Sequence, residues 1–212
     1  MIQIQSFQFN AFGENTYVLY DETKDAVVID PGCYEASERE ELDTFIENNG
    51  LNIKKLLNTH CHIDHVLGNL HVSHKYGVDL WIHELDLPLL SGVKIRAQQF
   101  GFPMYQEKDA DQFFKEGDII SFGNSNLEVI FTPGHAPGHV VFLNKKENIC
   151  IGGDVLFKQS IGRTDLPGGN HEELLSSIRN KLFVLDDNMT VYPGHGPTTT
   201  IGYEKVHNPF LK

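Results

Sequence analysis

The chain has 212 residues, 40% of them apolar, which is enough for a sizeable hydrophobic core. Its net charge of −12 disfavours nucleic acid as a partner, because nucleic-acid binding needs a basic surface. No apolar stretch approaches the length of a membrane span, and the amino-terminal residues lack the pattern of a secretion signal. Three scattered cysteines do not make a disulfide framework, so we expect a cytoplasmic protein without a membrane partner, and the oligomeric state stays open.

Strands and helices are expected to alternate through the first half of the chain. The predicted strands lie near 2–9, 16–20, 25–30, 53–58 and 78–82. The predicted helices lie near 35–49, over 64–76 with a stop at Gly77, and over 83–91. Residues 92–116 are expected to be irregular, and their aromatic side chains are candidates to wall a pocket or to fill the core.

The second half repeats this alternation. The predicted strands lie near 118–121, 126–131, 139–144, 148–153 and 190–192, and the predicted helices near 171–183 and 200–206. Asn170 is the expected cap of the first of these helices. Strands followed by helices in both halves favour a layered α/β fold, and the lack of a linker predicts a single domain over residues 1–212.

A cluster of metal-binding residue types stands at the strand-to-helix turn after residue 57. Residues 58–65 read Asn-Thr-His-Cys-His-Ile-Asp-His, with candidate ligands at His60, His62, Asp64 and His65. Imidazole and carboxylate groups suit zinc, iron and manganese. Alternate residues of an extended chain point to the same side, and a turn after Ile63 would bring the last two ligands in from another direction. In open α/β folds, ligands collect at the carboxyl ends of strands.

Three further candidate ligands each follow a predicted strand and stand beside turn-forming residues. They are His135 in Thr-Pro-Gly-His, Asp154 after Gly-Gly, and His195 in Pro-Gly-His-Gly. With the first cluster they provide five histidines and two aspartates. This set suffices for two metal ions with positions left for water and substrate.

Other polar residues have more than one interpretation. Asp30 follows an apolar run and is either a carboxylate that orients a ligand histidine or an ordinary turn residue. His139 is expected to be a hydrogen-bonded structural residue, and Cys61 to pack away from the ligands beside it. Surface or packing roles are expected for the histidines outside the ligand spacing, which are His71, His74 and His83.

The order His-x-His-x-Asp-His, Gly-His, Gly-Asp, Gly-His resembles the metallo-β-lactamase superfamily of hydrolases over nearly the whole chain. Residues 153–157, 160–169 and 192–197 resemble its short branch, which is similar to glyoxalase II, the hydroxyacylglutathione hydrolase. The resemblance implies an α/β fold, the four-layer αβ/βα sandwich, with the metal ions at one edge between two sheets. Full-length glyoxalase II carries a helical carboxyl-terminal domain that supplies basic residues for glutathione, and no such domain is expected here. Here the chain ends at Lys212, soon after the last ligand.

The resemblance implies roles for all seven ligands. The first ion would be held by His60, His62 and His135. The second would be held by Asp64, His65 and His195, with Asp154 bridging both ions. Asp64 and Asp154 are the carboxylates expected to serve catalysis, and the nucleophile would be water or hydroxide between ions about 3.5–4 Å apart. We expect two divalent ions, with zinc first and iron or manganese as alternatives. Asp154 argues against a zinc β-lactamase of the common type, where cysteine often takes this place.

The implied substrate is a small-molecule thioester, with S-lactoylglutathione the first compound to test. Arg163 matches a basic residue of the family that contacts glutathione, and the alternatives are a surface arginine or one paired with Asp165. Where the family has aromatic contacts to glutathione, this chain has Asp165 and Pro197. A second reading is a mono-iron persulfide dioxygenase, which has a similar Gly-Arg-Thr-Asp segment, and a third is a hydrolase of lactones or other esters. The Pro-Gly-His-Gly-Pro form around His195 favours hydrolysis.

Overall fold

A computed structural model describes residues 1–212, and the chain divides into two compact units. The first unit comprises residues 1–114 and 121–126, and the second comprises 115–120 and 127–212. The expectation of a single domain stays a prediction. No helix in the chain is both long and apolar enough to cross a membrane.

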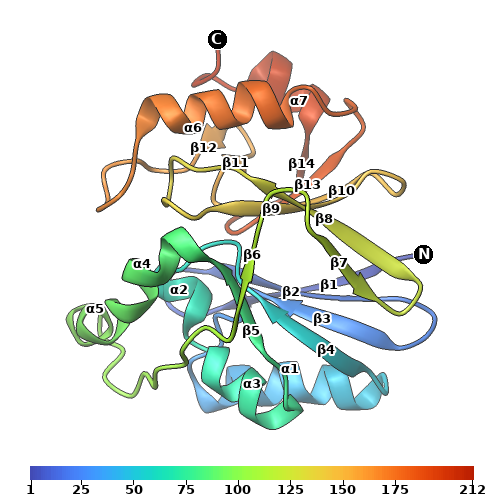
Figure 1. Ribbon diagram of the computed structural model, residues 1–212, viewed down its shortest axis with the longest axis vertical. Helices are drawn as coiled ribbons and strands as arrows, with labels where there is room; N and C mark the ends of the chain where they lie inside the picture. Colours follow the sequence, from blue (N-terminus) through green and yellow to red (C-terminus); the bar gives the residue numbers. More distant parts are fainter. The chain divides into compact units, whose positions relative to one another are not determined.

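The first unit contains a six-stranded sheet whose spatial order follows the sequence. Its strands are β1 (Gln3–Phe9), β2 (Glu14–Tyr20), β3 (Asp25–Ile29), β4 (Asn52–Leu57), β5 (Leu80–His83) and β6 (Gln112–Phe114). The first three are antiparallel, whereas β3 to β6 run parallel. Parallel neighbours need crossover connections, and α1 (Ala36–Asn48) and α3 (Asn69–Tyr76) supply two of them on one face of the sheet (Figure 1).

The helix expected over 64–76 is divided in two. A short α2 (Ile63–Val66) precedes α3, which ends at Gly77 in a left-handed conformation, as predicted. The break falls at Gly68, whose N–H donates to the carbonyl of Pro31 at 2.7 Å. A Cβ at Gly68 would lie 2.4 Å from the Cys33 sulfur. The chain therefore leaves the helix where its backbone presses against the segment that follows β3.

The expectation that residues 92–116 are irregular was wrong in part. After the short α4 (Leu87–Ser91), this segment forms α5 (Val93–Gln99) and the edge strand β6. Val93 and Ala97, four residues apart, are the buried side chains of α5. A helix of two turns with two buried positions leaves a weak apolar period in the sequence, which explains the omission.

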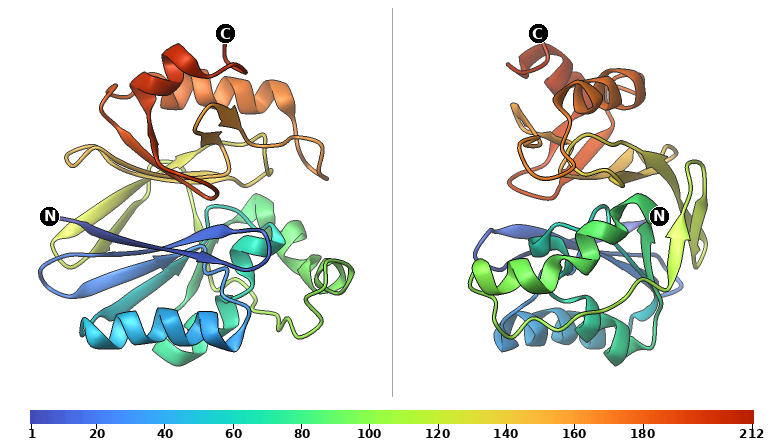
Figure 2. Two further views of the ribbon diagram at one scale, coloured as in Figure 1. Left: turned by 180° about the vertical axis from the view of Figure 1, so that it is seen from behind. Right: turned by 60° about the vertical axis from the view of Figure 1, so that its left-hand side comes forward.

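The second sheet has the order β14-β13-β10-β9-β8-β7. Its strands are β7 (Ile119–Phe122), β8 (Ser125–Phe131), β9 (Val140–Asn144), β10 (Ile149–Gly153), β13 (Thr190–Pro193) and β14 (Thr199–Thr200). The helices α6 (His171–Ser177) and α7 (Ile201–His207) cover one face (Figure 2). Leu174 and Ile201 from these helices share an apolar core with Val141 and Val191 of the sheet. Asn170 caps α6 by accepting from the Glu173 N–H at 3.2 Å, as predicted.

Candidate metal centre

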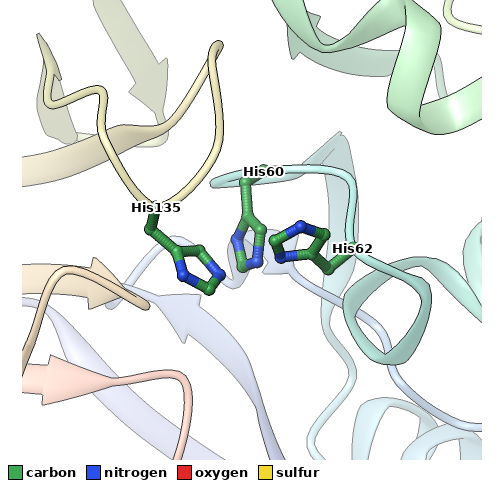
Figure 3. A group of neighbouring side chains, drawn as sticks. All are labelled: His60, His62 and His135. Carbon is green, nitrogen blue, oxygen red and sulfur yellow. The ribbon is translucent and has the colours of Figure 1, made fainter. Parts of the chain in front are cut away.

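Four candidate ligands of the first unit stand where β4 ends, and we call them the first ligand set: His60, His62, Asp64 and His65. Figure 3 shows His60 and His62 on the loop that follows β4. His62 is the extended residue before α2, and α2 carries the other two ligands. The ring centroid of His60 lies 4.9 Å from that of His62 and 4.1 Å from that of His65. The turn expected after the first two histidines therefore brings the imidazoles together.

Asp30 lies at the end of β3, the parallel neighbour of β4, and holds this loop. Its carboxylate accepts from the N–H and the hydroxyl of Thr59 at 2.7 and 2.6 Å, and lies 3.1 Å from Nδ1 of His65. Since the single proton of the Thr59 hydroxyl goes to Asp30, the oxygen accepts from Nδ1 of His60 at 3.0 Å. Both histidines then carry their proton on Nδ1 and offer the Nε2 lone pair to a metal. Of the two interpretations of Asp30, these contacts favour the one that orients ligand histidines.

Two further buried carboxylates at this loop were not predicted from the sequence. Glu14 is fully buried at the start of β2, with Oε1 3.9 Å from Nδ1 of His65. Burial raises the pKa of its carboxyl well above the ordinary value, the charge of His65 lowers it, and that of Asp30 raises it further. Asp86, also fully buried, accepts from the backbone N–H of Cys61 at 2.7 Å. The position of Glu14, a charged residue at the first position of a buried strand, could have indicated this role from the sequence. Nothing near Asp86 in the sequence pointed to Cys61, which is itself buried as expected.

The second ligand set consists of His135, Asp154 and His195, each after a strand of the second sheet. His135 lies on the loop after β8 (Figure 3). Asp154 and His195 follow β10 and β13, which are parallel neighbours, so both residues reach the same edge. The turns are joined by a hydrogen bond from the Gly194 N–H to the Gly153 carbonyl at 2.8 Å. Oδ2 of Asp154 lies 3.5 Å from Nε2 of His135 and 3.6 Å from Nε2 of His195.

Neighbouring groups orient this second set as well. Nδ1 of His135 lies 2.8 Å from the carbonyl of Arg163, so it donates there and leaves Nε2 toward Asp154. Nε2 of His139 accepts from the backbone N–H of Asp154 at 3.0 Å. His139 is fully buried, which confirms its expected structural role. The backbone of Gly162 packs closely against that of Asp154, since a Cβ at Gly162 would lie 1.9 Å from the Asp154 carbonyl oxygen.

The spacing of the donor atoms suits metal ions better than hydrogen bonds. Within the sets, histidine Nε2 and aspartate Oδ2 lie 3.5 to 3.7 Å apart, beyond the hydrogen-bond range of about 2.7–3.2 Å. Two donors that share a tetrahedral ion at about 2.0–2.1 Å stand roughly 3.4 Å apart. The Nδ1 atoms of His60, His65 and His135 are engaged elsewhere. The imidazole and carboxylate donors of the two sets therefore fit divalent metal ions. How the seven residues divide between two ions stays a prediction.

The remaining polar candidates have visible partners. Arg163 forms a bidentate ion pair with Asp165, with both bonds at 2.7 Å and both side chains exposed. This pairing holds the pKa of Asp165 at about 2. It is the alternative foreseen for Arg163, and its contact with a substrate stays a prediction. His71 pairs with Asp43 at 3.0 Å, and His83 accepts from the Leu85 N–H, in line with their expected surface roles.

The model of the metallo-β-lactamase superfamily matches residues 10–195, so the chain belongs to this superfamily of metal-dependent hydrolases and has its α/β fold. The motif resemblance is thereby confirmed. Among relatives, the Haemophilus influenzae protein named hydroxyacylglutathione hydrolase GloC is 41% identical, over 99% of this chain and 98% of its own. Two crystal structures are also similar. BLEG-1 B3 metallo-β-lactamase is 37% identical with a TM-score of 0.90, over 99% of this chain and 100% of its own. TTHA1623 in a di-iron-bound form is 34% identical with a TM-score of 0.85, over 98% and 100%.

Proposed function

We propose that the protein is a dinuclear metal-dependent hydrolase of a thioester such as S-lactoylglutathione. The observation that carries the metal chemistry is the pair of ligand sets, in which aspartate and histidine donors stand 3.5 to 3.7 Å apart. The thioester class is supported by the 41% identity with a hydroxyacylglutathione hydrolase across nearly the whole length of both chains. Asp64 and Asp154 are the proposed catalytic carboxylates.

The chain's own residues prepare the chemistry. Two bound divalent ions would polarise a thioester carbonyl and lower the pKa of a water molecule toward neutrality. Asp30 and Thr59 keep the His60 ring in one tautomer, so its Nε2 presents a lone pair at all times. The His135 ring is fixed in the same sense by the carbonyl of Arg163. Zinc is the first metal to expect, and the di-iron form of a relative keeps iron as an alternative. Three buried free thiols suit a reducing cytoplasm.

The reaction class is tested by giving the metal-loaded protein three substrates in turn. Hydrolysis is measured with S-lactoylglutathione and with a β-lactam, and oxygen uptake is measured with glutathione persulfide. We expect thioester cleavage without oxygen uptake. His195→Ala should lower kcat/KM more than about 100-fold, because losing even a residue that supports a ligand costs 10–100-fold. His207→Ala, at an exposed position on α7, is the matched control and should leave the rate unchanged.

Two other outcomes would replace the proposal. Oxygen uptake with the persulfide that survives His195→Ala would identify a mono-iron dioxygenase. Hydrolysis of the β-lactam without thioester cleavage would assign the function that the name of the BLEG-1 relative suggests.

Glutathione recognition is proposed to rest on Arg163. Removing its planar donors should raise KM for S-lactoylglutathione about tenfold in Arg163→Ala and leave kcat nearly unchanged. Asp165→Asn should lower KM, because it releases Arg163 from the ion pair seen in the structure. A thioester that lacks the glutathione carboxylates should not respond to either change. Equal losses on both thioesters would mean that Arg163 supports the loop and not the substrate.

A further inference from the structure

A second concave site lies in the first unit, between α1, α3 and the loop before β6. The pocket has a volume of about 370 Å³, at the small end of the range for small-molecule sites. Its walls carry the nitrogen-bearing side chains of Arg39, His71, His74 and Lys75, and Leu67 and Leu70 add apolar surface. None of these residues belongs to either ligand set. The pocket is therefore separate from the metal chemistry.

Arg39 is the unexplained group in this pocket. Its Nε is buried and has no hydrogen-bond partner, and no carboxylate lies within 4.0 Å of the guanidinium. Nearly all buried polar atoms in folded proteins find a partner, and an unmade bond to a charged group is costly. Because Arg39 lines the pocket and its guanidinium has no acceptor in the chain, a ligand in the pocket can supply one.

The acidic residue one helical turn after Arg39 is already engaged. The carboxylate of Asp43 accepts a hydrogen bond from the Tyr76 hydroxyl at 2.7 Å. It also pairs with Lys75 at 2.9 Å and with His71 at 3.0 Å. Burial raises the pKa of Asp43, but these hydrogen bonds outweigh it and lower the pKa overall, so the carboxylate stays ionised with its own partners.

Two other groups near Arg39 are also unable to neutralise it. Glu38 accepts from the backbone N–H groups of Tyr34, Glu35 and Asn10 and so caps α1. The neighbouring Cys33 thiol is neutral, because burial raises its pKa to about 12. Arg39 therefore forms no ion pair on the pocket wall, whereas Lys75 is paired with Asp43 and Glu47.

We propose that this pocket binds a small monocarboxylate with a short apolar body. The guanidinium of Arg39 presents a planar fork that matches a carboxylate, and Leu67 and Leu70 offer surface to a hydrocarbon chain. Lys75 adds little to the charge, because it is shared between Asp43 and Glu47. The amide of Gln106 supplies a further polar contact on the wall. A water molecule would satisfy the arginine nitrogen as well, but it would leave most of the volume and the leucine surface unused.

The test is titration of the metal-loaded protein with butyrate, acetate and sulfate at constant ionic strength, by calorimetry and by NMR of the histidine rings. Butyrate should bind and shift the ring signals of His71 and His74, which line the pocket. Each buried methylene group contributes about fourfold in affinity, so butyrate, with two more of them, should exceed acetate about 15-fold. Arg39→Gln should weaken butyrate at least about tenfold, and Arg39→Lys, which keeps the charge without the fork, should lie between.

The matched control is Arg179→Gln, the same change at an exposed position in the second unit. It should bind butyrate like the wild type. Equal butyrate affinity in the wild type and Arg39→Gln would place the binding elsewhere, for example at the metal ions, and would overturn the proposal. Sulfate binding as tight as butyrate would overturn the apolar part of it. Absence of butyrate binding to the wild type would overturn the proposal.

Discussion

At His60 and His65, the ring nitrogen that would face away from a metal is held by a chain of hydrogen bonds that ends at Asp30. Thr59 passes the interaction from Asp30 to His60, and Asp30 meets His65 directly at 3.1 Å. One carboxylate thus orients two imidazole rings of the same loop, and each ring keeps its Nε2 atom for a metal ion. Such supporting residues tune metal affinity without touching the ion.

We expect Asp30→Asn to weaken zinc binding about 10–100-fold, because an amide cannot accept all four hydrogen bonds that the carboxylate accepts. Competition with a chromogenic chelator measures this affinity without any substrate. Asp25→Asn, at the opposite end of β3 and paired with the exposed Lys54, is the control and should bind zinc normally. A folded Asp30→Asn protein with wild-type zinc affinity would mean that the rings are oriented by packing alone.

The hairpin of β11 (Leu156–Phe157) and β12 (Ser160–Ile161) is the element that ties Asp154 to His135. It begins just after Asp154 and returns to it at Gly162, whose N–H donates to the carbonyl of Val155 at 3.2 Å. Behind it, the buried carboxylate of Glu204 accepts from the Gln159 N–H at 2.9 Å. The hairpin therefore depends on both the metal-binding turn and α7.

Gly162→Ala should disturb the metal centre from a position that is not a ligand. Its Cβ would lie 1.9 Å from the Asp154 carbonyl oxygen and 3.2 Å from Nδ1 of His135, so backbone must move. Overpacking of this kind costs about 1–3 kcal/mol, and zinc affinity should fall with it. Chemical denaturation and chelator competition measure both. At Gly50 a Cβ meets nothing within 4 Å but φ is +61°, so alanine there should cost stability and leave zinc affinity intact, which separates strain from an effect on the metal centre. Wild-type zinc binding by Gly162→Ala would show that the hairpin does not position Asp154.

Asp21 joins two turns of the first unit. It is 1% exposed and accepts from Thr23, from the Asn124 N–H at 2.7 Å and from the Ser125 hydroxyl at 2.9 Å. Burial raises the pKa of its carboxyl, but these hydrogen bonds outweigh it and lower the pKa from 3.8 to about 2. Because the folded-state pKa is the lower one, the stabilisation is complete above the unfolded value and is lost as the pH falls.

Asp21→Asn should therefore lower the free energy of unfolding at pH 7 by about 1–3 kcal/mol, since a buried donor loses its acceptor. Urea denaturation at a series of pH values is the measurement. The difference from the wild type should shrink between about pH 4 and pH 2, where the wild-type carboxyl takes up its proton. A difference that stays constant over this interval would contradict the role of the ionised carboxylate.

At the scale of the whole molecule, the chain has a net charge of −12 and buried carboxylates near the candidate ligands. Bound cations would offset this negative charge, so we expect metal binding to raise the free energy of unfolding. Cations that bind only the folded chain stabilise it, by about 4 kcal/mol for one ion at a thousandfold excess over its Kd. Removing the metals should lower the thermal midpoint, and adding back zinc should restore it.

Metal content tests the dinuclear proposal directly. Elemental analysis of loaded protein should find two ions per chain, and Asp154→Ala should lose metal and activity together, because the proposed bridge neutralises charge between the cations. The control is Asp186→Ala at a surface turn. One ion per chain at full activity would exclude a dinuclear mechanism.

By itself, the sequence determined the features that depend on neighbours along the chain. The candidate ligands His60, Asp154 and His195 were recognisable because each follows a strand run, and parallel strands end at a common edge. The Asn170 cap and the stop at Gly77 were predictable for the same reason, since capping involves residues three or four positions apart. Local physics needs only a local window of sequence.

Only the tertiary structure revealed the contacts between distant segments. The sequence does not show that Asp86 contacts Cys61, that Gly68 contacts Cys33, or that Gly162 contacts the Asp154 carbonyl. Each of these contacts shapes a loop that carries candidate ligands, or the helix beside it. The engagement of Asp43 by His71 and Lys75, while Arg39 on the same helix forms no ion pair, could not be read from the sequence either. A partner chosen by packing depends on which surfaces the fold brings together, and residue spacing along the chain does not encode that choice.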